Sequence, residues 1–566
     1  MNPTIPKNPL SKIALSCSGG GYRAASFHLG AMAYLNKLKF QGKPLLENVK
    51  LISTVSGGTI TGAVYALMKQ DGKSFEEIYK FLLTNLRHLD LVKSGIEKLD
   101  PAKALNNPYK RKNLINAFAE LYDQHFTSGA TFEKFNNMRS HLDAVVFNST
   151  EFNNGINFRF RNKDTGFFGN HEIRIEPAAA QEVKVADAVA ASACFPGGFE
   201  PMIWPHDFIH EQSPNLKDLI KKNGKGIGIM DGGIYDNQGI QSILLYERKF
   251  DEPYFDLIII SDVASPDMKS FQAFAEKPKE GIRALSLSSL KEKVSKINKT
   301  LTFSLIAVSL LLFAAPLFWQ YTNTFLTGLM LGLALAPLLV LIFKWIVMAK
   351  VKEAFNSVTQ RTQNMIPVYY RSRLAGLKIE TLSVHRIEPL VFDRLNSLVT
   401  LLMDVFLKVV RRLNYSDLYN DKKFTYRRVS NLIKELTEDN FTETQARTKN
   451  EGVDKADVKS KSILKGTYDE VVGSKIKAVA QEASSFGTTL WFTEDHQLQN
   501  MLDKLVATGQ FTMCYNLLDY LEQILFVKNN GFEALEKQTQ KELHELYETI
   551  VQDWKAFKED PMMNLY

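Results

Sequence analysis

The sequence predicts a layered α/β fold with a mainly parallel central sheet, followed by a pair of membrane-spanning helices and a helical C-terminal region. Three observations support this prediction. Up to about residue 265, short apolar runs typical of buried strands alternate with helical patterns. Two apolar stretches without any charge then occupy residues 301–319 and 325–343. The rest of the chain has mostly helical periodicity.

The predicted strands of the first region are bounded by turn residues, and several run directly into a helix. Residues 11–18 form the first expected strand, and the helix after it covers residues 22–39. Residues 49–54 form the second strand, which meets a second helix at a serine and two glycines. Strands that alternate with helices favour a mainly parallel sheet. The other expected elements are strands at 142–149, 156–161, 226–230 and 255–263 and a helix at 185–193.

A chain of 566 residues is too long for one ordinary hydrophobic core, so we expect several regions. The alternating strands and helices assign residues 1–290 to an α/β core. Residues 301–343 form the predicted hairpin, and residues 350–566 form a helical region that completes or covers the core. Within that last region, residues 437–472 are polar and poor in large apolar groups, which predicts a mobile insertion.

The charge and the cysteine content exclude several classes of protein. A net charge of +7 permits contact with anionic lipid, but it is a modest excess without any nucleic-acid-binding motif, so we expect no nucleic acid partner. Cys17, Cys194 and Cys514 are far apart and predict neither a disulfide framework nor a zinc site. We therefore expect no metal and a reducing compartment. The N-terminal residues lack a long apolar run, which predicts no cleaved export signal.

The two apolar stretches predict a transmembrane hairpin. At about 1.5 Å per residue, a helix of roughly 19 residues spans about 28 Å, close to the thickness of a bilayer core. The polar residues 320–324 suffice for a turn, and they contain no lysine or arginine. The positive-inside rule then places both ends of the hairpin in the cytoplasm. The alternative is a buried hairpin in a large soluble core. The flanking lysines are Lys291, Lys293, Lys296, Lys299, Lys344, Lys350 and Lys352.

The second apolar stretch carries small residues on one helical face. Gly328 and Gly332 are four residues apart, and Ala336 follows after four more. Such a face lets another helix approach closely. The partner is either the first apolar helix or a second copy of the chain, which would make a homo-oligomer. Alternatively, the small residues only reflect the ordinary composition of a membrane helix.

A glycine-rich turn joins the first strand to its helix. Gly19, Gly20 and Gly21 let backbone amides approach a ligand at the positive end of a helix, and Arg23 follows them. Such a loop holds either a phosphate or the oxyanion of an acyl-transfer intermediate. A dinucleotide-binding loop is the main alternative. It requires an acidic residue at the end of the second strand, and residues 53–56 offer none.

Two further strand ends carry polar side chains in glycine-rich surroundings. Ser56 lies at a strand-to-helix junction before Gly57 and Gly58, where a sharp turn exposes a nucleophile. The alternative role of Ser56 is a helix N-cap. Asp231 follows a short strand and precedes Gly232 and Gly233, so it can serve as the base that a serine nucleophile needs. The alternative role of Asp231 is an Asx-turn.

Together and in this order, these motifs resemble the patatin-like phospholipase family. The resemblance covers roughly residues 10–265, and it includes the small residues and proline at 191–201. Residues 484–491 also resemble the distal end of bacterial members. The sequence departs from the family pattern at Thr54, two residues before Ser56, where the family usually has glycine. Threonine adds bulk at this position, which affects the expected geometry of the turn. The resemblance implies a three-layer fold and roles for nine residues: Ser56 as nucleophile, Asp231 as base, Gly19, Gly20 and Gly21 as oxyanion hole, and Arg23, Gly58, Gly232 and Gly233 as supporting residues.

The family resemblance implies a serine lipid acyl hydrolase that acts through an acyl-enzyme, without metal or cofactor. The expected substrate is a membrane phospholipid or lysophospholipid. Arg23 either orients the glycine loop or attracts a lipid phosphate, and His28 is expected to pack in the first helix. A lipid acyltransferase and a non-catalytic lipid-binding scaffold are the alternatives. Together with the hairpin, the resemblance predicts an enzyme in a bacterial inner membrane with its catalytic region in the cytoplasm.

Overall fold

The computed structural model describes residues 4–162, 168–223, 226–263, 278–318, 324–365, 382–438, 462–563 and 565–566, together with residues 272, 273 and 275. Most of the predicted turn at 320–324 and of the polar segment at 437–472 lies outside these residues. The chain divides into two compact units. The first contains Met1–Met268 and Leu402–Tyr566, and the second contains Lys269–Leu401. The two ends of the chain therefore fold together in one unit.

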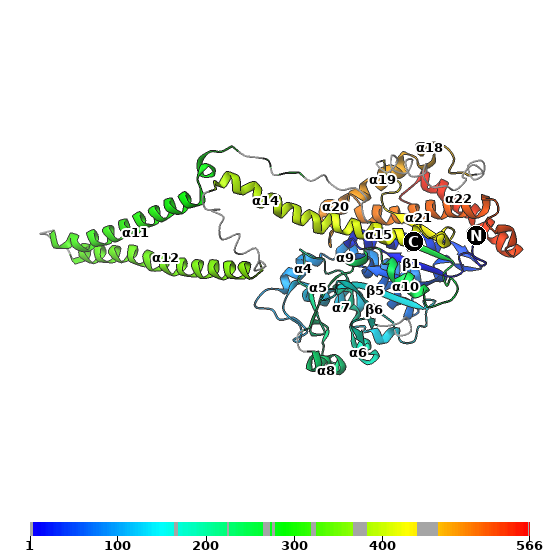
Figure 1. Cartoon of the computed structure of the whole chain (residues 1–566), viewed down its shortest axis with the longest axis horizontal. Helices are drawn as coiled ribbons and strands as arrows, with labels where there is room; N and C mark the ends of the chain where they lie inside the picture. Colours follow the sequence, from blue (N-terminus) through cyan, green and yellow to red (C-terminus); the bar gives the residue numbers. More distant parts are fainter. Residues whose placement is uncertain are drawn as a thin grey trace. The chain divides into compact units, whose positions relative to one another are not determined.

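The first unit is built around one sheet, which confirms the predicted fold class (Figure 1). Its centre has the order β12-β11-β1-β4-β5, and these neighbours pair in parallel. Antiparallel strands extend the sheet from β5, so the sheet is mixed. The parallel strands are β1 (Ile13–Cys17), β4 (Val49–Val55), β5 (Ala144–Glu151), β11 (Leu257–Asp262) and β12 (Arg428–Leu432). The antiparallel ones are β6 (Ile156–Arg161), β7 (Phe168–Gly169), β8 (Arg174–Ile175), β9 (Met202–Trp204) and β10 (Ile227–Asp231).

Helices cover both faces of the sheet, which makes three layers. One face packs against α10 (Ile240–Glu247) and α15 (Leu407–Tyr419) through a small apolar cluster that includes Ile243, Ile258 and Leu418. The other face carries the larger part of the core. The helices on that side include α1 (Gly21–Lys37), α2 (Gly57–Gln70), α21 (Met501–Phe526) and α22 (Lys537–Glu559). Other helices of this unit are α3 (Phe75–His88), α4 (Leu91–Lys98), α5 (Leu114–Tyr122), α7 (Val185–Ser192), α8 (Pro214–Asn223), α9 (Gly233–Asp236), α18 (Tyr468–Val472), α19 (Ser474–Ser485) and α20 (Glu494–Leu498).

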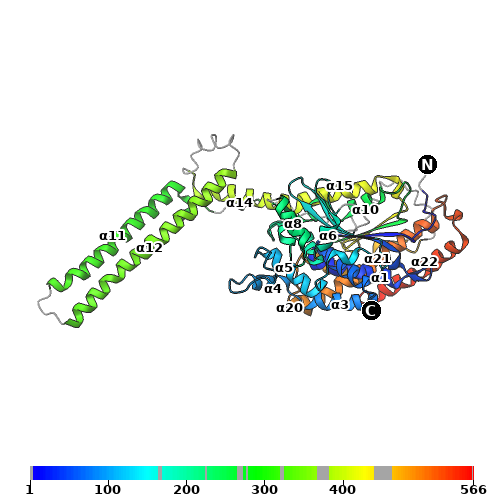
Figure 2. The same ribbon diagram turned by 90° about the horizontal axis from the view of Figure 1, so that it is seen from below.

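Helices α1 and α21 cross with their backbones in direct contact (Figure 2). A Cβ atom on Gly30 would lie 1.9 Å from the carbonyl oxygen of Val506, and one on Gly509 would lie 2.0 Å from that of Phe27. Only glycine fits at either position, because a heavier residue would push the helices apart. This crossing joins the C-terminal part of the chain to the helix that begins at the glycine loop.

The second unit contains the two apolar helices, α11 (Leu287–Phe318) and α12 (Thr324–Met365), and α14 (Val384–Thr400). Helices α11 and α12 run side by side (Figures 1 and 2). Residues Ser288–Ala315 and Gly328–Val347 are long and apolar enough to cross a membrane, and only 6% of the most apolar part of each is buried. This exposure contrasts with the alternative of a hairpin buried in a soluble core.

The two apolar helices contact each other away from the predicted small-residue face. The hydroxyl group of Ser309 donates a 2.6 Å hydrogen bond to the carbonyl oxygen of Ala334, and both residues are buried. Lys344 donates to the hydroxyl oxygen of Thr302 at 2.7 Å. A Cβ atom on Gly328 or on Gly332 would meet no atom of the described residues within 4 Å. Among the described residues, these two glycines therefore have no neighbour on α11.

Candidate active site

Strands β4 and β10 approach each other end to end along the same neighbour, β5. Val55 at the end of β4 pairs with Asn148, and Asp231 at the end of β10 pairs with Ser149, the next residue of β5. The parallel strand and the antiparallel strand therefore finish at adjacent positions. Backbone pairing alone therefore brings Ser56, the residue after Val55, next to Asp231.

Ser56 has the backbone conformation of an exposed nucleophile at a sharp turn. Its φ of 49° and ψ of −122° are unusual for a residue with a side chain, and such strain is typical of functional turns. Helix α2 begins at Gly57, yet the side chain of Ser56 makes no capping hydrogen bond, in contrast to the N-cap alternative. Small neighbours are required: a Cβ atom on Gly57 would lie 2.0 Å from the carbonyl oxygen of Gly21, and one on Gly58 would lie 2.5 Å from that of Cys17.

Thr54, the departure from the family pattern, is accommodated by a glycine on the helix after the turn. Thr54 is fully buried, and its hydroxyl group donates a 3.0 Å hydrogen bond to that of Thr59. Its methyl carbon occupies the space beside Gly62, where a Cβ atom would lie only 2.5 Å away. The added volume at residue 54 is therefore balanced by a missing side chain at residue 62, and the turn at Ser56 keeps its geometry.

Asp231 is buried next to the predicted nucleophile. Only 5% of its surface is exposed, and this burial raises the pKa of Asp231 to about 7. The amide of Gly233 donates to the carboxylate at 2.7 Å, and the neighbouring side chain of Ser56 also interacts with it; both interactions oppose the rise in the pKa of Asp231. The bond from Gly233 is the Asx-turn considered as an alternative, so Asp231 shapes its own turn and also contacts Ser56.

Ser192 connects the serine turn, β5 and the aspartate turn. Its hydroxyl oxygen accepts a 2.9 Å hydrogen bond from the amide of Ser56 and donates a 2.7 Å bond to the carbonyl oxygen of Asn148. Its hydroxyl group also lies 2.9 Å from that of Thr59 on α2. Its carbonyl oxygen accepts from the amide of Gly232 at 3.3 Å. One buried side chain thus links the serine turn to β5, while its backbone holds the aspartate turn.

The glycine loop runs beside Ser56, as predicted from its place after the first strand. A Cβ atom on Gly19 would lie 3.0 Å from Cβ of Ser56. The amide of Gly19 already donates to the carbonyl oxygen of Asn237 at 3.0 Å. Within the described residues, the amides of Gly20 and Gly21 have no protein acceptor, and both residues have positive φ, at 147° and 59°. These two amides are therefore free to bind a developing oxyanion.

A segment from the far end of the chain closes over this loop. The carbonyl oxygen of Thr489 accepts a 2.8 Å hydrogen bond from the amide of Tyr22. A Cβ atom on Gly21 would lie 2.3 Å from the same oxygen, so only glycine fits here. The rings of Tyr22 and Phe492 lie 5.8 Å apart. We call residues 486–492 the closing segment; it holds the first turn of α1 from outside.

Arg23 fixes the closing segment to the glycine loop. Its guanidinium group donates to the carbonyl oxygen of Phe486 at 2.8 Å and to the hydroxyl oxygen of Thr488 at 3.3 Å. Burial lowers the pKa of Arg23, and the nearby charge of Asp262 opposes this effect. Of the two roles predicted for Arg23, its contacts match orientation of the loop, because the side chain binds protein atoms.

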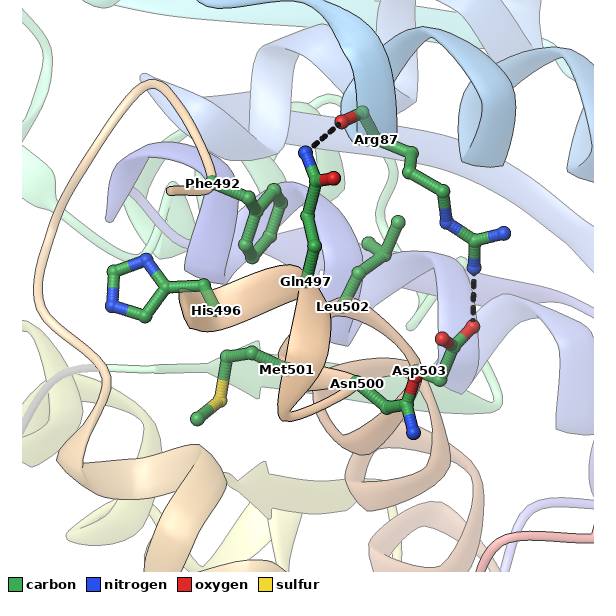
Figure 3. A pocket seen from close by; sticks show the side chains of 8 residues that line it. All are labelled: Arg87, Phe492, His496, Gln497, Asn500, Met501, Leu502 and Asp503. Carbon is green, nitrogen blue, oxygen red and sulfur yellow. Dashed lines mark hydrogen bonds and ion pairs between the residues drawn. The ribbon is translucent and has the colours of Figure 1, made fainter. Parts of the chain in front are cut away.

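A small cavity lies behind the closing segment (Figure 3). Its volume is about 200 Å³, and it includes neither Ser56 nor Asp231. Arg87 bridges its wall, because the guanidinium group lies 2.7 Å from the carboxylate of Asp503 and the carbonyl oxygen accepts from Gln497 at 3.2 Å. The lining residues are Arg87, Phe492, His496, Gln497, Asn500, Met501, Leu502 and Asp503.

Two side chains near the site were not identified from the sequence. Tyr122 is buried, its hydroxyl group has no hydrogen-bond partner among the described residues, and burial together with the charge of Asp231 raises its pKa. The side-chain oxygen of Asn237 lies 2.5 Å from a Cβ atom built on Gly19 and 2.7 Å from one built on Gly233. Neither residue belongs to a recognisable motif, so only the fold reveals their position.

His28 and the three cysteines lie in the core. The two ring nitrogens of His28 contact the hydroxyl oxygen of Ser261 at 2.8 Å and the carbonyl oxygen of Ser18 at 3.0 Å. Burial lowers the pKa of His28 to about 4, so the ring is neutral and packs as predicted. Cys17, Cys194 and Cys514 are free and buried. No group of three or more potential metal ligands occurs within the part of the chain that the structure describes.

Comparisons with known proteins identify the domain that carries this site. Residues 15–244 match the model of a family described as patatin-like phospholipase, and no curated protein matches the chain. Human GIVD cytosolic phospholipase A2 is 12% identical, with a TM-score of 0.26; the match covers 45% of this chain and 42% of that one. A second structure of that human protein is 11% identical, with a TM-score of 0.27 and coverages of 45% and 46%.

VipD from Legionella pneumophila is 14% identical over 98% of this chain and 94% of its own, with a TM-score of 0.24. The chain thus spans less than half of the human enzyme that it matches. Structural likeness at these TM-scores adds no argument, and the assignment depends on the family model. Its residues 15–244 contain the glycine loop, Ser56 and Asp231. Residues 15–244 therefore form a patatin-like phospholipase domain.

Proposed function

We propose that this protein is a membrane-anchored serine lipid acyl hydrolase that acts on phospholipid or lysophospholipid, with Ser56 as nucleophile and Asp231 as base. One observation carries the proposal. Ser56 stands in a strained turn at the end of β4, next to a buried carboxylate whose pKa lies near neutrality. A base with a pKa near the working pH combines the correct protonation state with a useful driving force for proton transfer.

In the proposed reaction, the hydroxyl oxygen of Ser56 attacks the ester carbonyl carbon while Asp231 takes its proton. The oxyanion binds to the amides of Gly20 and Gly21. The intermediate then expels the alcohol, which leaves with the proton from Asp231, and an acyl-enzyme remains. Water attacks this ester next, Asp231 accepts the water proton, and the proton returns to Ser56 as the fatty acid leaves.

The proposal also places α11 and α12 in a membrane. Helices α11 and α12 cross the bilayer as an antiparallel hairpin, with both flanking segments and the catalytic unit on the cytoplasmic side. The exposed apolar side chains of both candidate spans support this, because such surface is costly to leave in water, at roughly 25 cal/mol per Å². The lysines that flank the hairpin are costly to move across the bilayer.

The small-residue face of α12 supports a further part of the proposal, association with a second copy of the chain. Gly328 and Gly332 have open space at their Cβ positions and do not face α11. A second copy can approach closely at such a face. Gly332→Ile should reduce crosslinked dimers in membranes without releasing the protein from them. Unchanged crosslinking would contradict association at this face.

The decisive experiment compares the products formed from mixed membrane lipids by the native protein and by Ser56→Ala, detected by mass spectrometry. Ser56→Ala and Asp231→Asn should each remove nearly all release of fatty acid. Because the pair acts as a unit, the double variant should be little worse than either single one. A fluorophosphonate probe should label the native protein at Ser56.

Ser485→Ala is the matched control, because Ser485 is an exposed serine on α19. It should retain full activity and full labelling by the fluorophosphonate. A folded Ser56→Ala protein that retained a tenth or more of the native activity would exclude Ser56 as the nucleophile. Acyl transfer to added glycerol in place of water, with the same dependence on Ser56, would identify the acyltransferase alternative.

A further inference from the structure

One face of helix α15 carries three polar side chains that contact other segments of the first unit. Arg411, Asn414 and Tyr415 are three and four positions apart, so they lie on the same side of the helix. Arg411 and Tyr415 both contact Asp262, the last residue of β11. Asn414 contacts α9, which packs against α15 (Figure 1). This face of α15 therefore reaches two segments that border the candidate active site.

Asp262 is a buried carboxylate whose charge Arg411 compensates. The side chain of Asp262 is fully buried, and that of Arg411 is 13% exposed. The guanidinium group donates to the carboxylate at 2.9 Å, and the hydroxyl group of Tyr415 donates to the same oxygen at 3.0 Å. Burial lowers the pKa of Arg411, but the charges and hydrogen bonds of Asp262 and Tyr415 together outweigh this effect and leave it raised. Because a buried charge without its partner is costly, the position of Arg411 fixes that of Asp262.

Val263, the residue after Asp262, is the first connection from this ion pair to the glycine loop. Its amide donates a 3.0 Å hydrogen bond to the hydroxyl oxygen of Ser18, directly before the three glycines. The amide of Ser18 donates in turn to the carbonyl oxygen of Ser261 at 3.0 Å. A Cβ atom on Gly20 would lie 2.6 Å from a methyl carbon of Val263. A displacement of Asp262 is therefore passed to the loop through direct contacts.

Gln238 is the second connection. Its side-chain amide donates to the carboxylate of Asp262 at 3.2 Å, and its carbonyl oxygen accepts from the hydroxyl group of Ser16 on β1. The carbonyl oxygen of the preceding residue, Asn237, accepts a 3.0 Å hydrogen bond from the amide of Gly19. This bond anchors the start of the glycine loop, and the next two amides are the proposed oxyanion donors. Two separate routes thus lead from the ion pair to those donors.

Asn414 contacts the turn on the other side of the site. Its side-chain amide donates to the carbonyl oxygen of Tyr235 at 3.3 Å and to the carboxylate of Asp236 at 3.2 Å. Both acceptors belong to α9, which begins at Gly233, and the amide of Gly233 donates to Asp231. The same helical face therefore contacts the segments that hold the glycine loop and the proposed base.

We propose that α15 sets the spacing between the oxyanion donors and the base: Arg411 positions the glycine loop through Asp262, and Asn414 positions the aspartate turn through α9. Within the described contacts, neither side chain touches Ser56 or Asp231, so both are positioning residues. An oxyanion exists only after attack on the ester, so a displaced loop lowers kcat and leaves substrate binding unchanged. This inference rests on the proposed function for its catalytic effect, but the seating of both loops can be measured without catalysis.

The first test removes the guanidinium group beside a matched control. Arg411→Ala should lower kcat for a soluble short-chain ester by about 10²-fold with little change in KM, the effect expected of a small displacement. Arg411→Lys restores a cation and should recover part of the loss. Arg412→Ala is the control, because Arg412 is the next residue of the same helix and is exposed, and it should retain the native kcat. A folded Arg411→Ala protein with native kcat would overturn the role of Arg411.

Tyr415→Phe keeps the proposal testable if Arg411→Ala does not fold. It preserves the ion pair and removes a single hydrogen bond to Asp262. Its kcat should fall by about tenfold, the effect of one hydrogen bond to a charged group. Should Arg411→Ala not fold, native kcat in both Tyr415→Phe and Arg411→Lys would overturn the role of the ion pair.

Amide hydrogen exchange on the full chain in detergent separates positioning from a general loss of stability. The amide of Ser18 reports on the glycine loop, because it is bonded to the end of β11, and that of Asp236 reports on the aspartate turn, because it is bonded to Gly232. Arg411→Ala should speed exchange at Ser18 and leave Asp236 at the native rate. Asn414→Ala should do the reverse. Equal acceleration at both amides in either variant would indicate a purely stabilising role and overturn the proposal.

Ser56→Ala distinguishes a failure of this inference from a failure of the proposed function. Native exchange at Ser18 in Arg411→Ala, with hydrolysis still lost in Ser56→Ala, would overturn the positioning and leave the hydrolase intact. Faster exchange at Ser18 with unchanged kcat would also overturn the positioning. Faster exchange at Ser18 in a protein whose hydrolysis does not depend on Ser56 would support the seating of the loop by α15 and exclude the proposed hydrolase.

Discussion

Thr54 and Gly62 form a complementary pair: the methyl carbon of Thr54 lies 2.5 Å from the point where a side chain on Gly62 would begin. Thr54 lies at the end of the strand that leads to Ser56, and Gly62 lies in the second turn of the helix that follows. The bulk added on one side of the serine turn is thus removed on the other. The pair preserves the turn despite the departure from the family pattern.

Gly62→Ala should therefore destabilise the protein. Overpacking of a core typically costs about 1–3 kcal/mol, so the midpoint of thermal unfolding should fall and hydrolysis should fall with it. Adding Thr54→Ser should restore both, because serine lacks the methyl group and keeps the hydroxyl bonded to Thr59. Thermal denaturation and an ester assay on the native chain, both single variants and the double variant measure this. A double variant no better than Gly62→Ala would contradict the pairing.

The pKa of Asp231 sets the pH dependence of activity. The base must be ionised to accept a proton, and burial raises its pKa to about 7. Hydrolysis of a soluble ester should therefore rise from pH 5 to pH 8 with a midpoint near 7, as kcat/KM for the free enzyme. An unperturbed carboxylate would instead give a midpoint near its ordinary value of 3.8. Activity already constant from pH 5 upward would show that Asp231 does not limit the reaction.

The same buried carboxylate makes stability depend on pH. Because the folded pKa of Asp231 is raised, the stability gained from its neutral form is complete below the unfolded value of 3.8 and is lost as pH rises through about 7. Asp231→Asn removes this charge. At pH 8 the variant should unfold at a higher temperature than the native protein, and its free energy of unfolding should be larger by at most about 4 kcal/mol. This difference should shrink toward pH 4. A variant less stable at pH 8 than the native chain would disagree with this sign.

Arg23 should affect turnover rather than substrate binding. Its bonds to Phe486 and Thr488 hold the closing segment against the glycine loop. Arg23→Ala should lower kcat for a soluble ester by about 10²-fold with little change in KM, the effect expected of a small misplacement of the loop. Thr488→Val removes only the weaker bond and should have a smaller effect, and Arg23→Lys should recover part of the loss. A raised KM with normal kcat would instead assign Arg23 to lipid phosphate.

The proposed hairpin predicts opposite accessibility at its turn and at its base. Thr324→Cys, at the start of α12, should react with an impermeant maleimide from outside intact cells. Leu290→Cys, near the start of α11, should react only after the membrane is opened. The positive-inside rule and the uncharged turn are the physical basis. The reverse pattern of labelling, or release of the protein by carbonate, would overturn the hairpin.

The first half of the fold could be predicted from the sequence because its motifs are short and local. The turns at Gly19, Ser56 and Asp231 each follow a short apolar strand, and the structure brings all three to one place. Strand β12 was not recognised, because only its second and fourth residues, Val429 and Asn431, are buried, and it resembles an ordinary polar segment. Ser192 was included only in a small-residue segment, because its role depends on contacts with residues far away in the sequence.

The pairing of β11 with β12 has a consequence for the order in which the protein is made. These adjacent strands are separated in the chain by the whole second unit, since β11 ends at Asp262 and β12 begins at Arg428. A nascent chain that has just completed the apolar hairpin already carries Ser56 and Asp231. It still lacks the edge strand, α21 and the closing segment that secures the glycine loop. Under the proposed function, the membrane anchor is therefore synthesised before the catalytic unit can be completed.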